Sequence, residues 1–188
     1  MKKNLCRKGI CGWLSLSMVL TGMSGSALAL HAEEVQAEET ASVTADIYPK
    51  PQNETYLSDE GMSLSGEVNI VVHGDQEEAT IPKLQEMLAD NGYTYVQGDY
   101  DASKSNIIIS SSREHCDECM KTESEALDHT EGYVLSSSDD ENVNGDVTIV
   151  GSDADGAYYG IMTLRQMLEQ KSSGGKIAEV TIEDYPEI

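Results

Sequence analysis

The chain has 188 residues, of which 34 are Asp or Glu and only 12 are Lys or Arg, so its formal net charge at pH 7 is −22. A polyanion of this size repels the phosphates of nucleic acids and anionic membrane surfaces, which excludes both as electrostatically favoured partners. The length leaves room for one ordinary domain with a real hydrophobic core, in addition to a short leader.

The first 29 residues have the pattern of a secretory signal peptide. Four basic residues open the chain: Lys2, Lys3, Arg7 and Lys8. A short apolar run follows from Ile10 to Leu20, and Ala27-Leu28-Ala29 is typical of a cleavage site. We predict cleavage after Ala29 and a secreted or cell-surface protein. An uncleaved anchor is the alternative, but glycine and serine interrupt the apolar run that a membrane span requires.

Removal of this leader makes the protein more acidic. The leader holds four basic residues and no acidic residue, so its loss changes the net charge from −22 to −26. Residues 30–45 are rich in Glu among small and polar residues, which predicts an acidic linker. We expect the folded domain to span residues 46–188.

The first half of this domain alternates strand and helix patterns. Residues 47–52 are expected to be extended, because each proline disfavours the helical conformation of the residue before it. Residues 62–64 and 68–72 are typical of strands. Ile81, Leu84 and Leu88 lie at helical spacing, and Gly92 follows as a stop signal. Further strands are predicted at 93–96 and 106–110, the second of which is apolar on both faces and therefore central.

The second half contains the best helix pattern of the chain. Strands are predicted at 133–137 and 147–150, joined by a turn over 139–145. In the segment 153–168, the residues Ala157, Ile161, Leu164 and Leu168 share one helical face, and Asp153 or Asp155 could cap its start. A last strand is predicted at 177–182. These elements predict an α/β chain of the α+β type, with a mixed sheet of about six or seven strands and two helices on one face.

Two adjacent carboxylates invite a catalytic interpretation. Asp139 and Asp140 could divide the acid and base roles of a hydrolytic pair. They lie, however, in a stretch of Ser, Asp, Asn and Gly that is typical of a hairpin turn, which favours a structural role.

A close cysteine pair suggests a second kind of site. Cys116 and Cys119, with His115 and His129, could supply four zinc ligands, or the cysteines could form a redox pair. The pair does not follow a strand at a helix start, as a thioredoxin-like motif would. A small local disulfide or two free thiols in a surface insertion, residues 111–131, is the structural alternative.

The remaining candidates are aromatic residues and a glycosylation motif. Tyr158 and Tyr159 could stack on sugar rings, but at the start of a packed helix they favour core or interdomain contacts. Asn53-Glu54-Thr55 matches an N-glycosylation acceptor. The sequence predicts no catalytic, cofactor-binding or metal-binding residue in this chain.

Three segments resemble a known family. They are Ile47-Tyr48-Pro49-Lys50-Pro51-Gln52, the stretch from Gly151 through Tyr158-Tyr159-Gly160 to Leu168, and Ile182-Glu183-Asp184-Tyr185-Pro186. In this order and spacing they resemble the N-terminal, non-catalytic domain of bacterial glycoside hydrolase family 84 enzymes. Those enzymes are β-N-acetylglucosaminidases, often labelled hyaluronidases. Family 20 hexosaminidases carry a similar domain.

The resemblance implies that the active site lies in another domain. In these families the Asp-Tyr-Pro segment leads into the first strand of a catalytic (β/α)8 barrel, where the substrate's own 2-acetamido oxygen attacks the anomeric carbon. We therefore expect an exported accessory domain of such a hydrolase, cut off before its barrel, with that barrel as its partner and the glycan bound there. The alternative is a stand-alone secreted module that binds carbohydrate or protein, and a metal or redox role for the cysteine pair is a third hypothesis.

Overall fold

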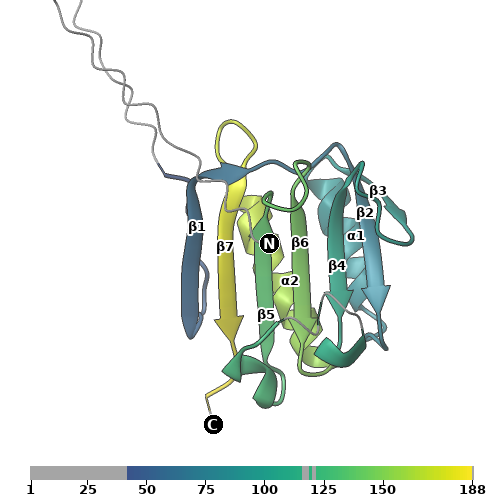
Figure 1. The fold of residues 1–188 in the computed structure, drawn as a ribbon, viewed down its shortest axis with the longest axis vertical. Coiled ribbons are helices and arrows are strands. Elements are labelled where there is room, and N and C mark those ends of the chain that lie inside the picture. The colour runs from purple at the N-terminus through teal and green to yellow at the C-terminus, as the bar shows by residue number, and fades with distance from the viewer. Residues whose placement is uncertain (1–41, 116–118, 120–121, 188) are drawn as a thin grey trace, which may run out of the picture. The chain divides into compact units, whose positions relative to one another are not determined.

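The computed structural model describes residues 42–115, 119 and 122–187. The predicted signal peptide and most of the predicted linker lie outside these residues. The described part forms one seven-stranded sheet with two α-helices (Figure 1). Its elements are β1 (Asn53–Met62), β2 (Glu67–His73), α1 (Thr80–Asp90), β3 (Thr94–Gln97), β4 (Ser105–Ser110), β5 (Tyr133–Ser138), β6 (Asp146–Gly151), α2 (Ala154–Glu169) and β7 (Ile177–Asp184). The fold class expected from the sequence is confirmed.

The sheet is mixed, with the strand order β1-β7-β5-β6-β4-β2-β3. Strands β3, β2, β4 and β6 run parallel, whereas β5 pairs antiparallel with both β6 and β7, and β1 pairs antiparallel with β7. Helix α1 connects β2 to β3, and α2 connects β6 to β7 across β5, as parallel connections require. The predicted central strand, β4, is buried along its whole length.

Both helices cover the same face of the sheet, behind it in the view of Figure 1. The core lies between them and the inward-facing strand residues, and its fully buried side chains include Ile70, Leu84, Ile107, Leu135, Ile149, Ile161, Leu164 and Leu168. The four apolar residues that predicted the helical face of α2 are all buried in this core. Burial of this stripe is the main stabilisation of α2 against the sheet.

Strand β1 does not lie where the sequence pattern predicted a strand. The prediction of a strand over 62–64 is wrong except at Met62, because β1 runs from Asn53 to Met62 and pairs with β7 from Asn53↔Glu183 onward, whereas residues 63–65 belong to no strand. Its register with β7 shifts between Tyr56 and Ser58 and again before Met62. These irregularities break the strict alternation of apolar and polar residues, and an edge strand has only one partner to bury it, so the usual strand signal is lost.

Helix α2 approaches the sheet closely at two glycines. A Cβ on Gly156 would lie 2.2 Å from the backbone oxygen of Gly132, and one on Gly160 would lie 2.4 Å from Cγ2 of Ile149. Only glycine allows this separation between the helix and the β5–β6 hairpin. The helix begins after Asp153, whose Oδ1 accepts the N–H of Gly156 at 2.8 Å. Of the two residues predicted as possible caps, Asp153 and Asp155, it is therefore Asp153 that caps the helix.

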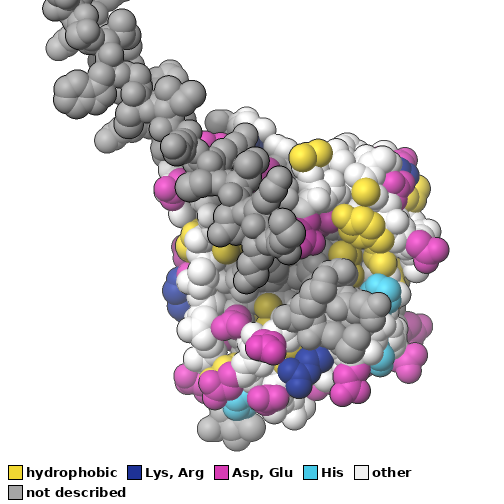
Figure 2. Space-filling view, viewed as in Figure 1, with side chains coloured by type: hydrophobic (Ala, Val, Ile, Leu, Met, Phe, Trp, Pro, Cys, Tyr) yellow, Lys and Arg dark blue, Asp and Glu magenta, His cyan; other side chains and the backbone are white. Residues whose placement is uncertain are grey.

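Among the described residues, the opposite face of the sheet carries no α-helix, and we call it the helix-free face. Its character changes across the strands. One row of residues in register runs from β2 to β1: Val71, Ile108, Thr148, Ser136, Thr181 and Thr55. The row is apolar on β2 and β4 and bears hydroxyl groups on the other four strands. Figure 2 shows this side of the molecule, with Asp and Glu side chains spread around it and few Lys and Arg. Within the described residues, no helix is both long and apolar enough to cross a membrane.

Candidate interdomain surface

The three segments that carry the family resemblance meet in space. A shallow depression of about 590 Å³ is lined by residues from each of them, among others Tyr48, Lys50, Tyr159, Gln166, Tyr185 and Pro186, and by Glu187 just after the third segment. The depression lies at the end of the domain where the chain leaves the sheet after β7, because Asp184, the last residue of β7, is one of the residues that line the depression. We refer to Tyr48, Lys50, Glu131, Tyr159, Tyr185 and Glu187 together as the tyrosine surface.

The segment before β1 is fixed to α2 by two glutamine side chains. Oε1 of Gln166 accepts the N–H of Tyr48 at 2.9 Å, and its Nε2 donates to the Tyr48 carbonyl at 3.1 Å. One turn later, Gln170 makes the same pair of bonds with the backbone of Asp46, both at 2.8 Å. Because alternate residues of an extended segment point their backbone groups the same way, two glutamines at i and i+4 can bind it as a neighbouring strand would.

A buried polar group supports the floor of the depression. The hydroxyl of Tyr133 on β5 lies 2.5 Å from Oγ1 of Thr163 on α2, and both side chains are buried. Burial raises the pKa of Tyr133 well above its ordinary value. Burial likewise raises the pKa of Asp184, against the opposing effect of the hydrogen bond from the Gln52 N–H. Asp184 thus links the exit of β7 to the start of β1.

Tyr185 is held by an aromatic contact. Its ring stacks on the imidazole of His129, with ring centroids 3.9 Å apart and an interplanar angle of 5°. His129 follows a 3₁₀ turn, Glu125–Asp128, so the insertion between β4 and β5 fixes the chain just after β7. The chain direction at Tyr185 is therefore set by the folded domain.

Asp153 joins the start of α2 to the neighbouring loop. Its Oδ2 accepts the N–H of Glu131 at 2.9 Å, while its Oδ1 caps the helix. Glu131 adopts a positive φ of 62° at this bend. The Glu131 carboxylate is the main cause that raises the pKa of Tyr159, whose side chain is 44% exposed. Tyr158 contacts the Tyr159 ring edge to face, with centroids 6.1 Å apart.

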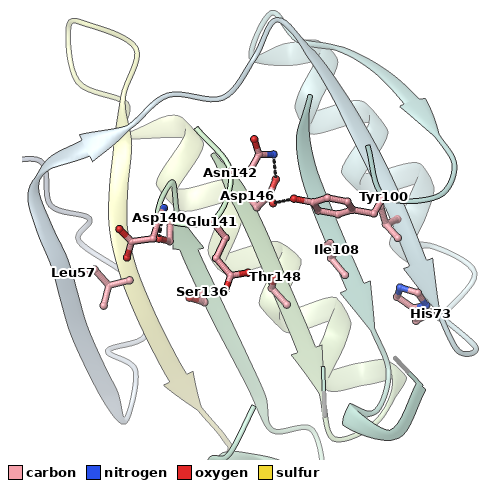
Figure 3. A pocket seen from close by; sticks show the side chains of 12 residues that line it. Leu57, His73, Tyr100, Ile108, Ser136, Asp140, Glu141, Asn142, Asp146 and Thr148 are labelled. Carbon is pink, nitrogen blue, oxygen red and sulfur yellow. Dashed lines mark hydrogen bonds between the residues drawn. The ribbon is translucent and has the colours of Figure 1, made fainter. Parts of the chain in front are cut away.

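A second depression, of about 750 Å³, lies on the helix-free face of the sheet (Figure 3). Tyr100 lies at its side, and its hydroxyl donates to Oδ2 of Asp146 at 2.8 Å. Burial, with the Asp146 carboxylate second, raises the pKa of Tyr100 to about 12. Asp140 and Glu141, from the β5–β6 turn, also line it.

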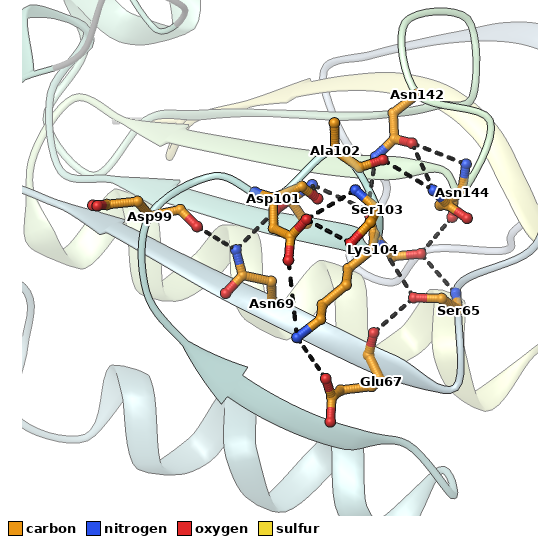
Figure 4. Close-up of polar contacts among 12 residues, drawn as sticks. Ser65, Glu67, Asn69, Asp99, Asp101, Ala102, Ser103, Lys104, Asn142 and Asn144 are labelled. Carbon is orange, nitrogen blue, oxygen red and sulfur yellow. Dashed lines mark hydrogen bonds and ion pairs between the residues drawn. The ribbon is translucent and has the colours of Figure 1, made fainter.

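Amide side chains organise the loops at this end of the sheet. The buried Asn106 amide nitrogen donates to the backbone oxygen of Asp101 at 3.0 Å, and its oxygen accepts from Asn69 at 2.9 Å. Asn142 bonds the backbone oxygen of Lys104, so the β5–β6 turn is tied to the loop before β4 (Figure 4). These bonds satisfy buried polar groups and give the loops a structural role.

The predicted carboxylate pair lies in the predicted turn. Asp139 and Asp140 come between the end of β5 and the start of β6, and both are exposed. The N–H of Asp139 donates to Oε1 of Glu179 at 3.3 Å, and that of Asp140 donates to Oγ of Ser138 at 3.1 Å. Their backbones are thus part of the turn, as expected for this stretch.

The predicted ligands around the cysteine pair have separate contacts. Cys119 is buried against Val71, Ile108 and Val150 on the helix-free face and is disulfide-bonded, whereas Cys116 lies outside the described residues. His115 lies 3.4 Å from Oγ of Ser111, and His129 stacks on Tyr185. In the part of the chain that the structure describes, no three His, Cys, Asp or Glu side chains form a group that could hold a metal ion.

The glycosylation motif that the sequence shows lies on β1. Asn53 is exposed at the start of β1, where its amide donates to Oε2 of Glu183 at 3.3 Å. The sequence gives no signal for Gln166 and Gln170, because glutamines four residues apart on a helix are common and do not indicate a partner. From the sequence, His129 is a candidate only as a metal ligand.

Comparison with known proteins assigns the domain to a family. Residues 44–185 match the family described as "Glycosyl hydrolase family 20, domain 2". The chain belongs to this family. The match begins just before the segment bound by Gln170 and Gln166 and ends at Tyr185, so family 20 domain 2 covers the sheet, both helices and the tyrosine surface except Glu187.

Solved structures of glycoside hydrolases share this fold. CpGH84D is 23% identical, with a TM-score of 0.64, and CpGH84B is 27% identical, with a TM-score of 0.57. The β-N-acetylhexosaminidase from Bacteroides fragilis NCTC 9343 is 18% identical, with a TM-score of 0.51. Each match covers 76% of this chain but only 24%, 23% and 25% of those chains, respectively. The family and the fold identify an accessory domain of the type found in family 20 and family 84 hydrolases.

Proposed function

We propose that this chain is the exported accessory domain of a glycoside hydrolase that acts at N-acetylglucosamine residues, of the β-N-acetylglucosaminidase or hyaluronidase type. The observation that carries the proposal is the family 20 domain 2 match over residues 44–185. The name of the Bacteroides fragilis relative, a β-N-acetylhexosaminidase, supports the substrate class. The relatives are about four times as long as the matched part, which leaves room for a catalytic barrel.

The chemistry of the proposed hydrolase belongs to that barrel. A retaining mechanism in which the 2-acetamido oxygen of the substrate attacks the anomeric carbon needs acidic residues around the sugar to orient the acetamido group and protonate the leaving oxygen. The exposed Asp139 and Asp140 lie in a turn of the accessory domain, where their N–H groups donate to Glu179 on β7 and to Ser138, and they lie on none of the segments that form the tyrosine surface. We assign them no catalytic role.

Hydrolysis of an aryl N-acetylglucosaminide tests the proposal. The 188-residue chain and a longer protein extended along its genomic reading frame would be assayed side by side. The longer protein is expected to hydrolyse the substrate and the 188-residue chain to be inactive. Turnover by the 188-residue chain that is lost in an Asp139→Asn/Asp140→Asn variant would contradict the proposal.

A stand-alone binding module is the second candidate function. The observation that favours it is the exposure of Tyr48 and Tyr100, 84% and 48%, beside the two depressions, since exposed aromatic rings are typical sugar contacts. Calorimetric titration with N-acetylglucosamine oligomers would detect such binding. A stop codon directly after Ile188, together with saturable binding, would favour the module over the accessory domain.

Export rests on the first 29 residues. A basic start, an apolar run and a small-residue cleavage site are the features of a secretory signal. We expect protein recovered outside the cell to begin at Leu30. N-terminal sequencing that finds Met1 on the mature protein would contradict cleavage.

A further inference from the structure

We propose that the depression on the helix-free face is a glycan-binding site that selects amino sugars with a free ammonium group. The inference goes beyond the proposed function, because it concerns a binding site on this domain and does not depend on a catalytic barrel. It commits to one kind of ligand, a short chain of β-linked glucosamine units.

The floor of this depression combines apolar and hydroxyl groups. Val71 on β2 and Ile108 on β4 line one side. Thr148 on β6 and Ser136 on β5 line the other side (Figure 3). The four residues are neighbours in the register of the sheet, so they form one continuous surface. A sugar ring presents C–H groups on its faces and hydroxyl groups at its edge, and it can therefore use both halves of this floor.

The position of the floor in the sheet excludes a peptide that binds as an additional strand. Strands β4, β6 and β5 are interior strands, and each pairs with a neighbour on both sides. Strand addition requires an exposed edge, whereas a ligand on this face is bound through side chains. The volume of about 750 Å³ lies within the range of small-ligand sites, roughly 300–1,000 Å³, and has room for a short chain of sugars.

Tyr100 provides an aromatic wall that is exposed and yet fixed. It is 48% exposed, and its hydroxyl donates to Oδ2 of Asp146 at 2.8 Å. The Oδ1 atom of Asp146 accepts from the Asn142 amide at 2.9 Å and from the Asn106 N–H at 2.8 Å. This network gives the Tyr100 hydroxyl a structural role but does not account for the exposed ring. A fixed aromatic ring loses little conformational entropy when a ligand stacks on it, and its face attracts cations.

Charge determines which sugar suits the site. Asp140 and Glu141 line the depression together with Asp146, whereas none of its described lining residues is Lys or Arg. Figure 3 shows Asp140 and Glu141 across the floor from Tyr100. Because Asp146 is already bonded to Tyr100, the two exposed carboxylates of the turn are the ones that can accept hydrogen bonds from an ammonium group. The same carboxylates repel the carboxylate of a uronic acid.

A glucosamine chain satisfies all parts of the depression together. Its ammonium groups pair with the carboxylates of Asp140 and Glu141, its ring stacks on Tyr100, and its hydroxyls meet the polar half of the floor. If the proposed function also holds, this site binds partly deacetylated chains of N-acetylglucosamine and disfavours hyaluronan, which carries uronic acids.

Calorimetric titration of the 188-residue chain tests the class of ligand. The probes are tetramers of glucosamine and of N-acetylglucosamine, a hyaluronan tetrasaccharide and tetralysine, at a mildly acidic pH that keeps the amines charged. The glucosamine tetramer is expected to bind at one saturable site and more tightly than the other three. Equal affinity for tetralysine would show only the attraction of an acidic chain for cations and would overturn the proposal. Equal affinity for the acetylated tetramer, or no binding of glucosamine, would overturn it as well.

Two double variants with the same change of charge locate the site. Asp140→Asn/Glu141→Gln should weaken binding of the glucosamine tetramer about fivefold, because two exposed carboxylates are lost from the rim. Glu77→Gln/Glu78→Gln removes two exposed carboxylates that do not line the depression and should leave the affinity unchanged. An equal loss in both variants would show that net charge, not this depression, binds the ligand.

Substitutions of Tyr100 separate the ring from the hydroxyl. Tyr100→Ala should weaken binding about tenfold, since the aromatic wall is lost. Tyr100→Phe keeps the ring and should restore most of that affinity, although it too loses the bond to Asp146. Equal losses in the two variants would contradict the ring contact. If Tyr100→Ala does not fold, the exposed carboxylate pair decides the question.

The outcome is independent of the test of the proposed function. Failure of glucosamine binding would remove this site and leave hydrolysis by the longer protein untouched. Failure of that hydrolysis would remove the proposed function and leave the binding measured on the 188-residue chain.

Discussion

Gln166 holds Tyr48 by both of its backbone groups, at 2.9 Å to the N–H and 3.1 Å to the carbonyl oxygen. The helix thereby acts as a strand partner for the segment that precedes β1. This relationship couples the first family segment to the second and sets the position of the most exposed tyrosine of the tyrosine surface.

Removal of either glutamine should loosen that segment. Gln166→Ala and Gln170→Ala each lose two hydrogen bonds, and at these exposed positions we expect a cost of about 1 kcal/mol in the free energy of unfolding for each. Urea denaturation would measure it. Glu169→Ala, which removes only an exposed ion pair with Arg165, is the control and should cost under about 0.5 kcal/mol. Equal effects of all three variants would argue against the strand-like role.

The close approach of α2 to the sheet should not tolerate a methyl group. Gly156→Ala places Cβ 2.2 Å from a backbone oxygen that cannot move freely, so we expect a net loss of about 2 kcal/mol despite the better helix propensity of alanine. Gly66→Ala, where nothing lies within 4 Å of the new atom, should change stability by less than about 0.5 kcal/mol. Thermal or urea unfolding distinguishes the two, and a neutral Gly156→Ala would show that the helix can shift outward.

The two carboxylates at the start of α2 should differ in importance. Asp153→Ala removes the helix cap and the bond to the Glu131 N–H, for an expected cost of about 2 kcal/mol. Asp155→Ala removes only a favourable charge in the first turn, worth about 0.3–1 kcal/mol. Urea midpoints of the two variants test this order, and Asp155→Ala as the more damaging change would contradict it.

Asp184 should make stability depend on pH in a defined direction. Burial raises the pKa of the Asp184 carboxyl in the folded protein above its ordinary value, so folding favours the protonated form. The stabilisation of the folded state by protonated Asp184 is therefore fully present below the pKa of Asp184 in the unfolded chain, and it is lost as the pH rises through the pKa of Asp184 in the folded protein. The asparagine side chain of the Asp184→Asn variant does not ionise, so the variant should not show this pH-dependent loss of stability. The stability of the variant relative to wild type should therefore increase from pH 3 to pH 7.

Parallel unfolding curves of wild type and Asp184→Asn across this range provide the test. The difference between the two proteins cancels the contributions of the other carboxylates, and Asp140→Asn serves as a substitution control at an exposed turn. A difference that stays constant with pH would show that burial does not govern the ionisation of Asp184.

The sequence by itself determined the regular elements with their own periodicity. The helical face of Ala157, Ile161, Leu164 and Leu168 and the apolar run at 107–109 depend on local spacing, and both occur as expected in α2 and β4. The turn over 139–145 was equally local. The three family segments are also recognisable from their order and spacing, which indicate the accessory-domain class without any tertiary contact.

Tertiary structure decided what depends on partners distant in the chain. Most of β1 has no clear alternation and becomes a strand only because the edge of β7 is available to it. The contact of Gln166 with Tyr48 joins residues 118 positions apart, and the stack of His129 on Tyr185 joins two elements with no shared pattern. A sequence pattern reports the environment of one element, whereas a surface built from several elements exists only once the sheet order has brought them together.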